Sequence, residues 1–332
     1  VNGTARYPQS DWNSLSAYLA YKNNLSEKFI FEAGVRYSFF TLDATFDTTF
    51  YPFPFTKTNT QEGSVSGNVG ILFNPDETTT MNLNLSSGFR SPNVDDLGKV
   101  FDSEPGAVVV PNPNLKEEYA YNVDLGIAKV FDDFLKIDAT GFYTILENAM
   151  VRRDFTLNGN DSLFYDGEMS KVQAIQNAAN ANVWGIQTGL EIKFPLGFGL
   201  SVRANYQKGE EELDDGTKSP LRHAAPIFGT AHFTYSANKI KLDFYGIANG
   251  EISYKNLPKE ERGKDYMYAI DQNGNPYSPS WYTVNLKVDY KLLEYFSLIG
   301  GIENIFDQRY RPYSSGMVSV GRNFILSGKI KL

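Results

Sequence analysis

The sequence predicts an all-β protein built from one large antiparallel sheet of the kind that forms a transmembrane β-barrel. Two observations predict it. Apolar and polar residues alternate along most of the chain, and the segments between the predicted strands alternate strictly between short and long. Alternation at every second residue is typical of strands with two different faces. Apolar residues at helical spacing are not sustained over any segment of note, which disfavours helices.

Thirteen segments show this alternation. The segment 119–131 illustrates it, because Val123, Leu125 and Ile127 share one face, whereas Asn122 lies on the other. Many of the segments reach the ~9–11 residues that a tilted membrane strand needs. The expected strands are 13–25, 29–41, 65–73, 80–90, 119–131, 134–147, 183–194, 198–207, 226–236, 239–250, 281–290, 295–304 and 321–332.

The connections between these strands indicate a membrane barrel rather than a soluble one. Outer-membrane barrels have short periplasmic turns and longer extracellular loops, and a soluble sandwich or barrel has no reason to keep this asymmetry. Aromatic residues also gather near the strand ends, as in interfacial girdles, although ordinary packing in a β-core is the alternative. The expected short turns are 26–28, 74–79, 132–133, 195–197, 237–238 and 291–294. The expected long loops are 42–64, 91–118, 148–182, 208–225, 251–280 and 305–320.

Composition excludes several other classes of protein. The chain of 332 residues has no Cys and two His, which removes disulfide scaffolds, thiolate metal sites and Cys nucleophiles. Its formal net charge of −8 argues against nucleic acid as a partner, because nucleic acid favours basic patches. No phosphate loop, nucleophile elbow or convincing acid pair for hydrolysis is present, so we expect neither enzymatic activity nor a cofactor.

Thirteen is an odd number of strands, and the predicted topology begins outside the membrane and ends inside it. A complete single-chain barrel has an even number of strands, with both ends in the periplasm. An open edge would leave backbone groups unpaired in lipid, at a cost of several kcal/mol each. We therefore expect residues 1–332 to form the C-terminal part of a larger transmembrane barrel.

Several stretches between residues 88 and 332 resemble sequence boxes of the TonB-dependent outer-membrane receptors, and their order and spacing carry the resemblance. The stretch Gly88-Phe89-Arg90-Ser91-Pro92-Asn93 resembles one family box, here called the first box. The stretch Pro111-Asn112-Pro113-Asn114-Leu115-Lys116-Glu117-Glu118 resembles another, the second box, although Glu117 replaces a usual Pro, and the stretch from Asn304 to Tyr310 is called the third box. The strongest match is Asn304-Ile305-Phe306-Asp307-Gln308-Arg309-Tyr310, and the stretches 177–191 and 221–226 also resemble family segments. The box residues that the resemblance marks as structural are Phe89, Arg90, Pro92, Asn112, Pro113, Leu115, Asn304, Phe306, Asp307 and Tyr310.

The resemblance implies a barrel of about 22 strands with a plugged lumen, in the bacterial outer membrane. It also implies an N-terminal plug, the first barrel strands and an energy-coupling TonB box, none of which occurs in this chain. The implied partners are that N-terminal segment, the TonB complex of the inner membrane, outer-membrane lipid and a small-molecule ligand such as an iron chelate.

The function that the resemblance implies is TonB-coupled active import of a scarce ligand. Iron in a siderophore or in haem is the expected cargo. Import of cobalamin or an oligosaccharide by the same mechanism is an alternative, and so is a passive porin or channel. An outer-membrane enzyme or adhesin has no supporting constellation of residues.

Candidate ligand contacts lie in the predicted extracellular loops. Arg152 and Arg153 begin the longest loop, and adjacent guanidinium groups suit anionic ligands such as ferric chelates. A solvated loop base and contact with anionic outer-leaflet lipid are the alternatives. Tyr offers a large rigid surface with a polar tip, and anchoring at the membrane interface is an equal alternative. The Tyr candidates are Tyr165, Tyr266, Tyr268, Tyr310 and Tyr313.

Metal-binding candidates are few. In haem receptors of the family a His between the first two boxes binds iron, but this chain has no His from Phe89 to Tyr119. His223 and His232 can bind haem iron through neutral imidazole, with hydrogen bonding in the lumen as the alternative. The acidic run 210–215 offers hard oxygen ligands for Ca²⁺, but a solvated loop has the same composition. The stretch 271–276 departs from a calcium-loop pattern, so we assign no metal site.

Overall fold

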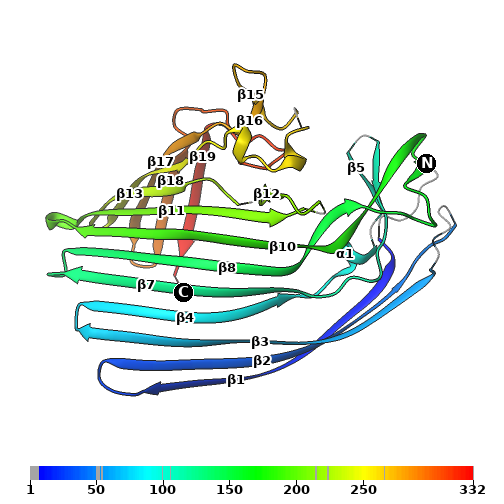
Figure 1. Cartoon of the computed structure of the whole chain (residues 1–332). Coiled ribbons are helices and arrows are strands. Elements are labelled where there is room, and N and C mark those ends of the chain that lie inside the picture. The colour runs from blue at the N-terminus through cyan, green and yellow to red at the C-terminus, as the bar shows by residue number, and fades with distance from the viewer. Residues whose placement is uncertain are drawn as a thin grey trace.

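The computed structural model shows one long, strongly curved antiparallel sheet (Figure 1). The structure describes residues 7–49, 53, 55–98, 100–104, 106–213, 215–222, 224–264 and 266–331. Within these residues thirteen long strands follow each other around the sheet, and each strand pairs with the next, which confirms the predicted fold class and the number of long strands. Their bounds are β1 Gln9–Asn24, β2 Phe29–Thr45, β3 Lys57–Asp76, β4 Thr79–Arg90, β7 Glu118–Phe131, β8 Leu135–Asp154, β10 Glu168–Lys193, β11 Phe198–Glu212, β13 Phe228–Ala237, β14 Ile240–Asn249, β17 Trp281–Leu293, β18 Phe296–Glu303 and β19 Asn323–Ile330.

Short turns and long loops alternate along the sheet as the sequence predicts, so all the long loops lie at one end of the strands (Figure 1). The strands extend further than predicted into the loops 42–64 and 148–182, whereas the loops 251–280 and 305–320 have about their predicted lengths. The largest difference is the predicted loop 148–182, of which only 155–167 separates β8 from β10. Pairing between the two strands continues to Gln173 opposite Asp154, with register shifts between Asn177 and Ala181. Ladder hydrogen bonds therefore order this hairpin beyond the expected membrane span.

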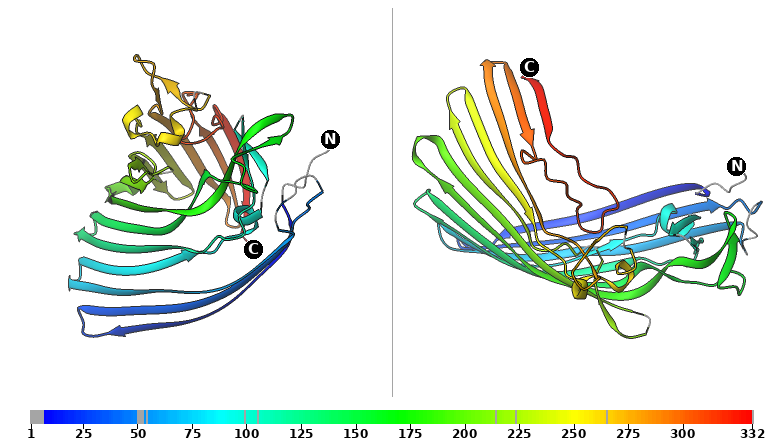
Figure 2. Two further views of the ribbon diagram at one scale, coloured as in Figure 1. Left: turned by 45° about the vertical axis from the view of Figure 1, so that its right-hand side comes forward. Right: turned by 90° about the horizontal axis from the view of Figure 1, so that it is seen from above.

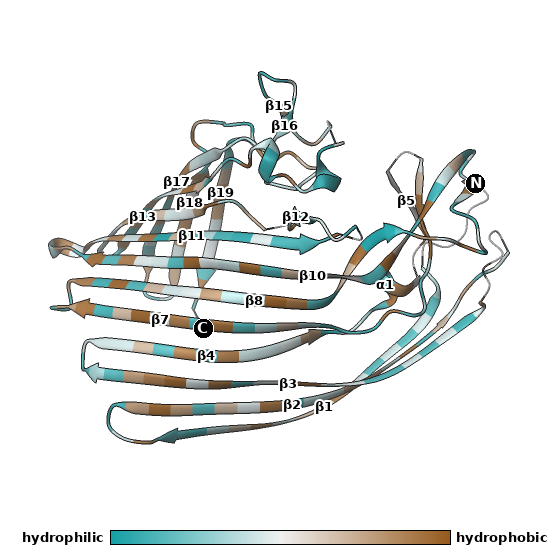
Figure 3. Cartoon of the chain, viewed as in Figure 1, coloured by the Kyte–Doolittle hydropathy of each residue, from teal (hydrophilic) through white to brown (hydrophobic). Residues whose placement is uncertain are grey.

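Apolar and polar residues alternate along the strands in Figure 3, and the two faces of the sheet differ as this alternation predicts. On β7 the side chains of Val123, Leu125 and Ile127 are exposed on the outer face. On the inner face, the Asn122 amide donates hydrogen bonds to Asp124, and the Thr144 hydroxyl donates to Asn122. An apolar outer face and a hydrogen-bonded inner face are what a lipid-facing barrel wall requires.

The sheet is open. Figure 2 shows a trough whose first and last strands, β1 and β19, lie apart. Among the described residues, β1 pairs only with β2 and β19 only with β18. In the part of the chain that the structure describes, no helix is long and apolar enough to cross a membrane.

Short elements in the loops add a second layer at the loop end of the sheet. They are α1 Val94–Gly98, β5 Phe101–Glu104, β6 Ala107–Val109, β9 Ser162–Tyr165, β12 Lys218–Pro220, β15 Ala269–Ile270 and β16 Pro276–Tyr277, with two 3₁₀ turns at Tyr254–Asn256 and Lys259–Glu261. A further 3₁₀ turn, Pro195–Gly197, forms the short connection between β10 and β11 at the opposite end. β6 pairs in parallel with the start of β10. This pairing draws the loop after β4 across the mouth of the trough, where Phe46, Val108 and Val172 share an apolar core.

Candidate ligand-binding site at the loop end of the sheet

A polar basin of about 680 Å³ opens at the loop ends of β8, β10 and β11. The loop 250–280, between β14 and β17, closes it on one side. Five cationic side chains and four acidic ones line the basin, so charged groups of both signs converge there. They are Arg152, Arg153, Arg222, Lys259, Lys264, Asp154, Glu211, Asp215 and Glu260.

Arg153 is the cation that ties this loop to the sheet. Its side chain projects from β8, is only 9% exposed, and donates a hydrogen bond of 2.8 Å from Nη1 to Glu260 Oε1. Next along the loop, Lys259 donates from its backbone N–H to the Ser219 hydroxyl and from Nζ to Thr217. The loop therefore rests on β8 and on the β11–β13 connection through polar contacts.

Glu261 is the buried centre of the same loop. Its side chain is fully buried, with Arg222 Nε at 2.9 Å and Lys264 Nζ at 2.7 Å from Oε1, and the Tyr268 hydroxyl donates to Oε2. Burial alone would raise the pKa of Glu261, but the hydrogen bonds from Lys264 and Tyr268 and the charge of Arg222 outweigh it and hold the pKa below its ordinary value. Burial and the bond to Glu261 raise the pKa of Tyr268 far above its ordinary value. Glu261 is thus ionised and orders the loop.

Glu211, one of the four acidic residues that line the basin, has a pKa shifted in the opposite direction to that of Glu261. It lies at the loop end of β11, beyond the expected membrane span, where it pairs with Ser219 of β12. Burial raises the pKa of Glu211, and the charge of Glu260 raises it further, against smaller opposing effects from Arg153 and Arg222. Protonation of Glu211 would leave the basin more positive.

The structure brings some predicted ligand contacts together and separates others. Arg152 and Arg153 both line the basin, but they lie in β8 and not in a loop, because β8 pairs with β10 as far as Asp154. Tyr165 packs against the apolar core of the loop layer. Tyr268 is buried with Leu257, and Tyr313 packs against that cluster.

None of the five Tyr candidates is among the residues that line the basin. Tyr266 is exposed on the loop 250–280. Tyr310 stacks on Trp281 with ring centroids 4.2 Å apart and lines a separate cavity of about 330 Å³ with Arg309. The sequence analysis missed Lys259, Glu260 and the buried Glu261, for which the charged run 259–262 was the available signal.

The first two family boxes hold the loop after β4. Asn93 accepts hydrogen bonds from the backbone of Asp95 and Asp96 and so caps α1, and Arg90 donates to Asp96 at 2.6 Å. The ring centroids of Phe89 and Tyr119 are 6.2 Å apart. Pro92 is fully buried.

The second box crosses to β10 through polar contacts. The Asn112 amide donates to the carbonyl of Ile175, and Pro113 follows it half-buried. Leu115 is buried against Leu97. The Asn177 side chain accepts a hydrogen bond from the Lys116 backbone N–H and donates one to the Lys116 carbonyl. This single side chain therefore joins the second box to β10.

The third box holds the loop before the last strand. Asn304 is buried in a left-handed conformation with φ of 50°, accepts from the Gln308 backbone and donates to its carbonyl. Asp307, with φ of 55°, accepts from the backbone of Arg322. Phe306 is exposed.

The His and acidic candidates show ordinary protein contacts. His232 lies on the inner face, as predicted, with Nδ1 3.0 Å from Asp243 and its ring stacked on Tyr245. His223 lies outside the described residues. Asp271 accepts from the backbone of Asn273 and Asn275 in a turn. No group of three or more potential metal ligands occurs among the residues that the structure describes.

The meandering sheet, its apolar outer face and the loops gathered at one end define a transmembrane β-barrel of the outer-membrane transport class. The family model "TonB dependent receptor-like, beta-barrel" matches residues 1–305. The chain belongs to this family, whose members are outer-membrane barrels and not enzymes.

Similar proteins agree with this assignment. The chain is 26% identical over 66% of its length to the Heme/hemopexin utilization protein C of Haemophilus influenzae, and 24% identical over 95% to the Hemoglobin-haptoglobin utilization protein B of Neisseria meningitidis serogroup A. It spans 29% and 40% of the length of these two relatives.

Solved structures share the fold. The Copper transporter OprC superposes over 97% of this chain and 48% of its own, with a TM-score of 0.72 and 14% identity. The ferric yersiniabactin uptake receptor FyuA of Yersinia pestis superposes over 97% of this chain and 46% of its own, with a TM-score of 0.66 and 16% identity.

Proposed function

We propose that the protein containing this chain imports an anionic iron chelate, a ferric siderophore or haem, across the outer membrane with energy supplied through TonB. The family membership supports the transport class, and the names of two relatives, which refer to heme and hemoglobin, support haem as cargo. The basin is the observation that carries the choice of an anionic ligand, because Arg152, Arg153 and Lys259 converge there at the extracellular end.

Two features of the basin suit such a ligand. Its volume of about 680 Å³ falls within the range of about 300–1,000 Å³ that is usual for small-molecule pockets. Its guanidinium groups can bind carboxylate or catecholate oxygens in bidentate fashion. A passive porin is not favoured by the family assignment, and import of cobalamin or an oligosaccharide would make less use of these cations.

The partners follow from the family and belong to the same proposal. We infer that a plug segment and further barrel strands of the same receptor complete the trough, and that the plug contacts the inner face of the sheet. TonB would act on that plug from the inner membrane. Outer-membrane lipid surrounds the apolar outer face.

The test is ligand binding by the purified whole receptor, with haemin and a ferric tricatecholate as the probes. We expect one probe to bind, and Arg152→Gln with Lys259→Gln to weaken it at least tenfold, since a charge-assisted hydrogen bond contributes about 1.5–3 kcal/mol. The control is Lys28→Gln, in a short turn at the opposite end of the sheet. The proposal would be contradicted if neither haemin nor the ferric tricatecholate bound to the wild-type receptor. It would also be contradicted if the Arg152→Gln/Lys259→Gln variant bound the probe as tightly as the wild type. Growth on the bound probe under iron limitation should also require TonB.

A further inference from the structure

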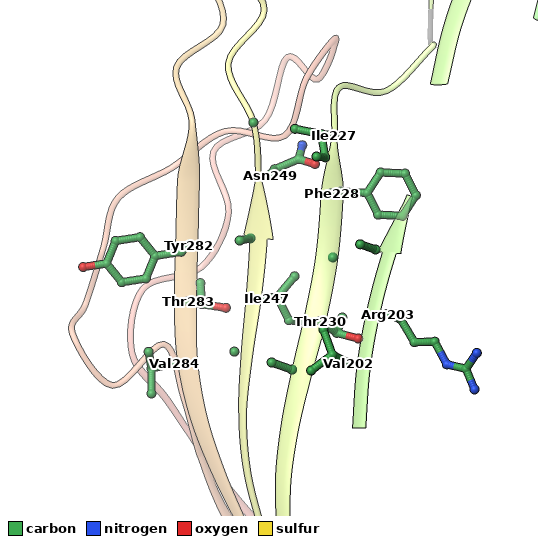
Figure 4. Close-up of a pocket in the computed structure, with 16 residues that line it drawn as sticks. Val202, Arg203, Ile227, Phe228, Thr230, Ile247, Asn249, Tyr282, Thr283 and Val284 are labelled. Atoms are coloured by element: carbon green, nitrogen blue, oxygen red, sulfur yellow. The ribbon is translucent and has the colours of Figure 1, made fainter. Parts of the chain in front are cut away.

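A groove of about 510 Å³ crosses the outer face of the sheet over β11, β13, β14 and β17 (Figure 4). Strand register produces it by aligning small residues. Ala204 lies opposite Gly229, which lies opposite Ala248 on the next strand. Two residues closer to the short turns, on the same face, Ala231 of β13 lies opposite Gly246 of β14. The floor of the groove is therefore almost bare backbone.

Bulky side chains on the same outer face lie on either side of this depression. Toward the short turns, beyond the residues that line the groove, Phe233 and Phe244 lie opposite each other and both are exposed. Ile227 and Tyr282 are exposed at the loop end of the groove. The alternation places Thr283 on the inner face, where it is buried. The groove is thus a depression within an otherwise bulky lipid-facing surface.

Backbone geometry requires only part of this depression. A Cβ at Gly229 would lie 2.5 Å from the carbonyl oxygen of Arg203, so a larger residue is not accommodated there. At Gly246 the nearest atom to such a Cβ would be the carbonyl oxygen of Thr283, at 3.6 Å, which is ordinary van der Waals contact. A side chain at Gly246 is therefore possible without strain and would fill the groove.

A cationic group lies beyond the loop end of the groove on the same outer face. Lys208 follows Ala204 and Tyr206 on alternate positions of β11, about 13 Å from Ala204 at the usual rise of a strand. Its side chain is half-exposed, and Nζ lies 3.5 Å from Glu210, which also lies 3.8 Å from Lys218. Lys side chains at this level place their charge at the lipid headgroups.

We propose that this groove binds one acyl chain of a net-anionic, phosphate-bearing lipid of the outer leaflet, with Lys208 contacting the headgroup. The surrounding medium is hydrocarbon, so a flexible chain of methylenes is the occupant available at this depth. The long-loop end of a barrel faces outward, which places the groove in the outer leaflet. A second copy of this chain fits less well, because an isologous contact would set one hollow against another.

The test is native mass spectrometry of the whole receptor released from detergent, with monophosphoryl lipid A and the zwitterionic dimyristoyl phosphatidylcholine as the probes. We expect one lipid A molecule to remain bound to the wild type. Gly246→Leu with Ala248→Leu should reduce the bound fraction at least fivefold, whereas Ala139→Leu, on the outer face of β8, should leave it unchanged. Lys208→Gln should lower retention of lipid A toward that of phosphatidylcholine.

Each outcome decides the proposal. The filled variant is the one that carries Gly246→Leu and Ala248→Leu. Equal retention of lipid A by the filled variant and by the Ala139→Leu control would overturn the proposal. A loss of receptor dimers in place of a loss of bound lipid would also overturn it. Heat modifiability on gels reports whether the filled variant folds. Should it not fold, Phe244→Ala provides the second measurement, because removing the bulky side chain next to Gly246 on the outer face of β14 should lengthen the depression and shift retention toward lipids with longer acyl chains. An unchanged chain-length preference would then reject the site. None of these readouts depends on the transported ligand.

Discussion

Single positions on β7 separate the lipid-facing and inward-facing sides of the barrel wall. Leu125 is 61% exposed on the outer face, whereas Asn122 is half-buried among inner polar groups. Arg in place of Leu125 should lower the free energy of unfolding by about 2–4 kcal/mol if the position lies near the bilayer midplane. Arg in place of Asn122 should cost much less. Reversible unfolding of the whole receptor in lipid vesicles measures both, and equal costs would show that the faces are wrongly assigned.

A second prediction at this scale concerns the buried Glu261. Glu261→Gln removes the charge that Arg222 and Lys264 share, and should destabilise the loop 250–280 by about 1.5–3 kcal/mol. The pKa of Glu261 is held below its ordinary value, so its ionisation stabilises the loop at neutral pH and this stabilisation is lost as the pH falls through the folded-state pKa. Limited proteolysis of the loop as a function of pH measures it.

The comparison for Glu261 comes from the neighbouring Glu260, which is partly exposed. Glu260→Gln should leave the acid-induced opening of the loop in place, whereas Glu261→Gln should remove it. A pH profile that is the same in wild type and Glu261→Gln would assign the transition to another group.

The sequence predicted which residues share a face better than it predicted which residues share a site. Alternation depends on neighbours within one strand, so the faces of β7 could be assigned from the sequence alone. The basin joins Arg153 to Glu260, which lie 107 positions apart, and no local pattern encodes that contact. Nor does a local pattern reveal that Glu261 is buried and accepts a hydrogen bond from the Tyr268 hydroxyl.

At the scale of elements, the sequence predicted the existence of the long strands more reliably than their ends. Lipid requires an apolar outer face, and that requirement produces the alternation. Beyond the membrane the outer face meets water, the alternation weakens, and backbone pairing alone continues β8 and β10 outward. The predicted loop 148–182 is therefore too long.

The loop after β4 offers a test of how one side chain orders a whole element. Asn177 of β10 exchanges hydrogen bonds with Lys116 and also donates to the carbonyl of Asn148. Asn177→Ala should cost about 1–3 kcal/mol by leaving these backbone groups without that partner. Faster hydrogen exchange over 106–117 in the whole receptor should report the change. The matched control is Asn114→Ala, an exposed position in the second box. Similar hydrogen exchange over 106–117 in both variants would show that the hydrogen bonds of Asn177 do not order this loop.

At the scale of the whole molecule, the sheet needs strands on both of its edges. β1 pairs only with β2, and β19 only with β18, within the residues described. An open edge within lipid leaves backbone N–H and C=O groups unpaired, at several kcal/mol each, and presents a template for aggregation. The trough in Figure 2 is therefore a stable wall only when further strands join both edges.

This requirement predicts the behaviour of the 332-residue chain on its own. Refolded in detergent, it should not give a monomeric species that migrates differently on gels before and after heating, because its edges remain unpaired. Refolding it together with a segment that supplies the other barrel strands of the same receptor should restore that species, with both segments in one complex by intact mass. A gel series with size-exclusion chromatography measures both. A compact, heat-modifiable monomer formed by the 332 residues alone would mean that β1 and β19 close on each other, and the open-sheet topology would then be wrong.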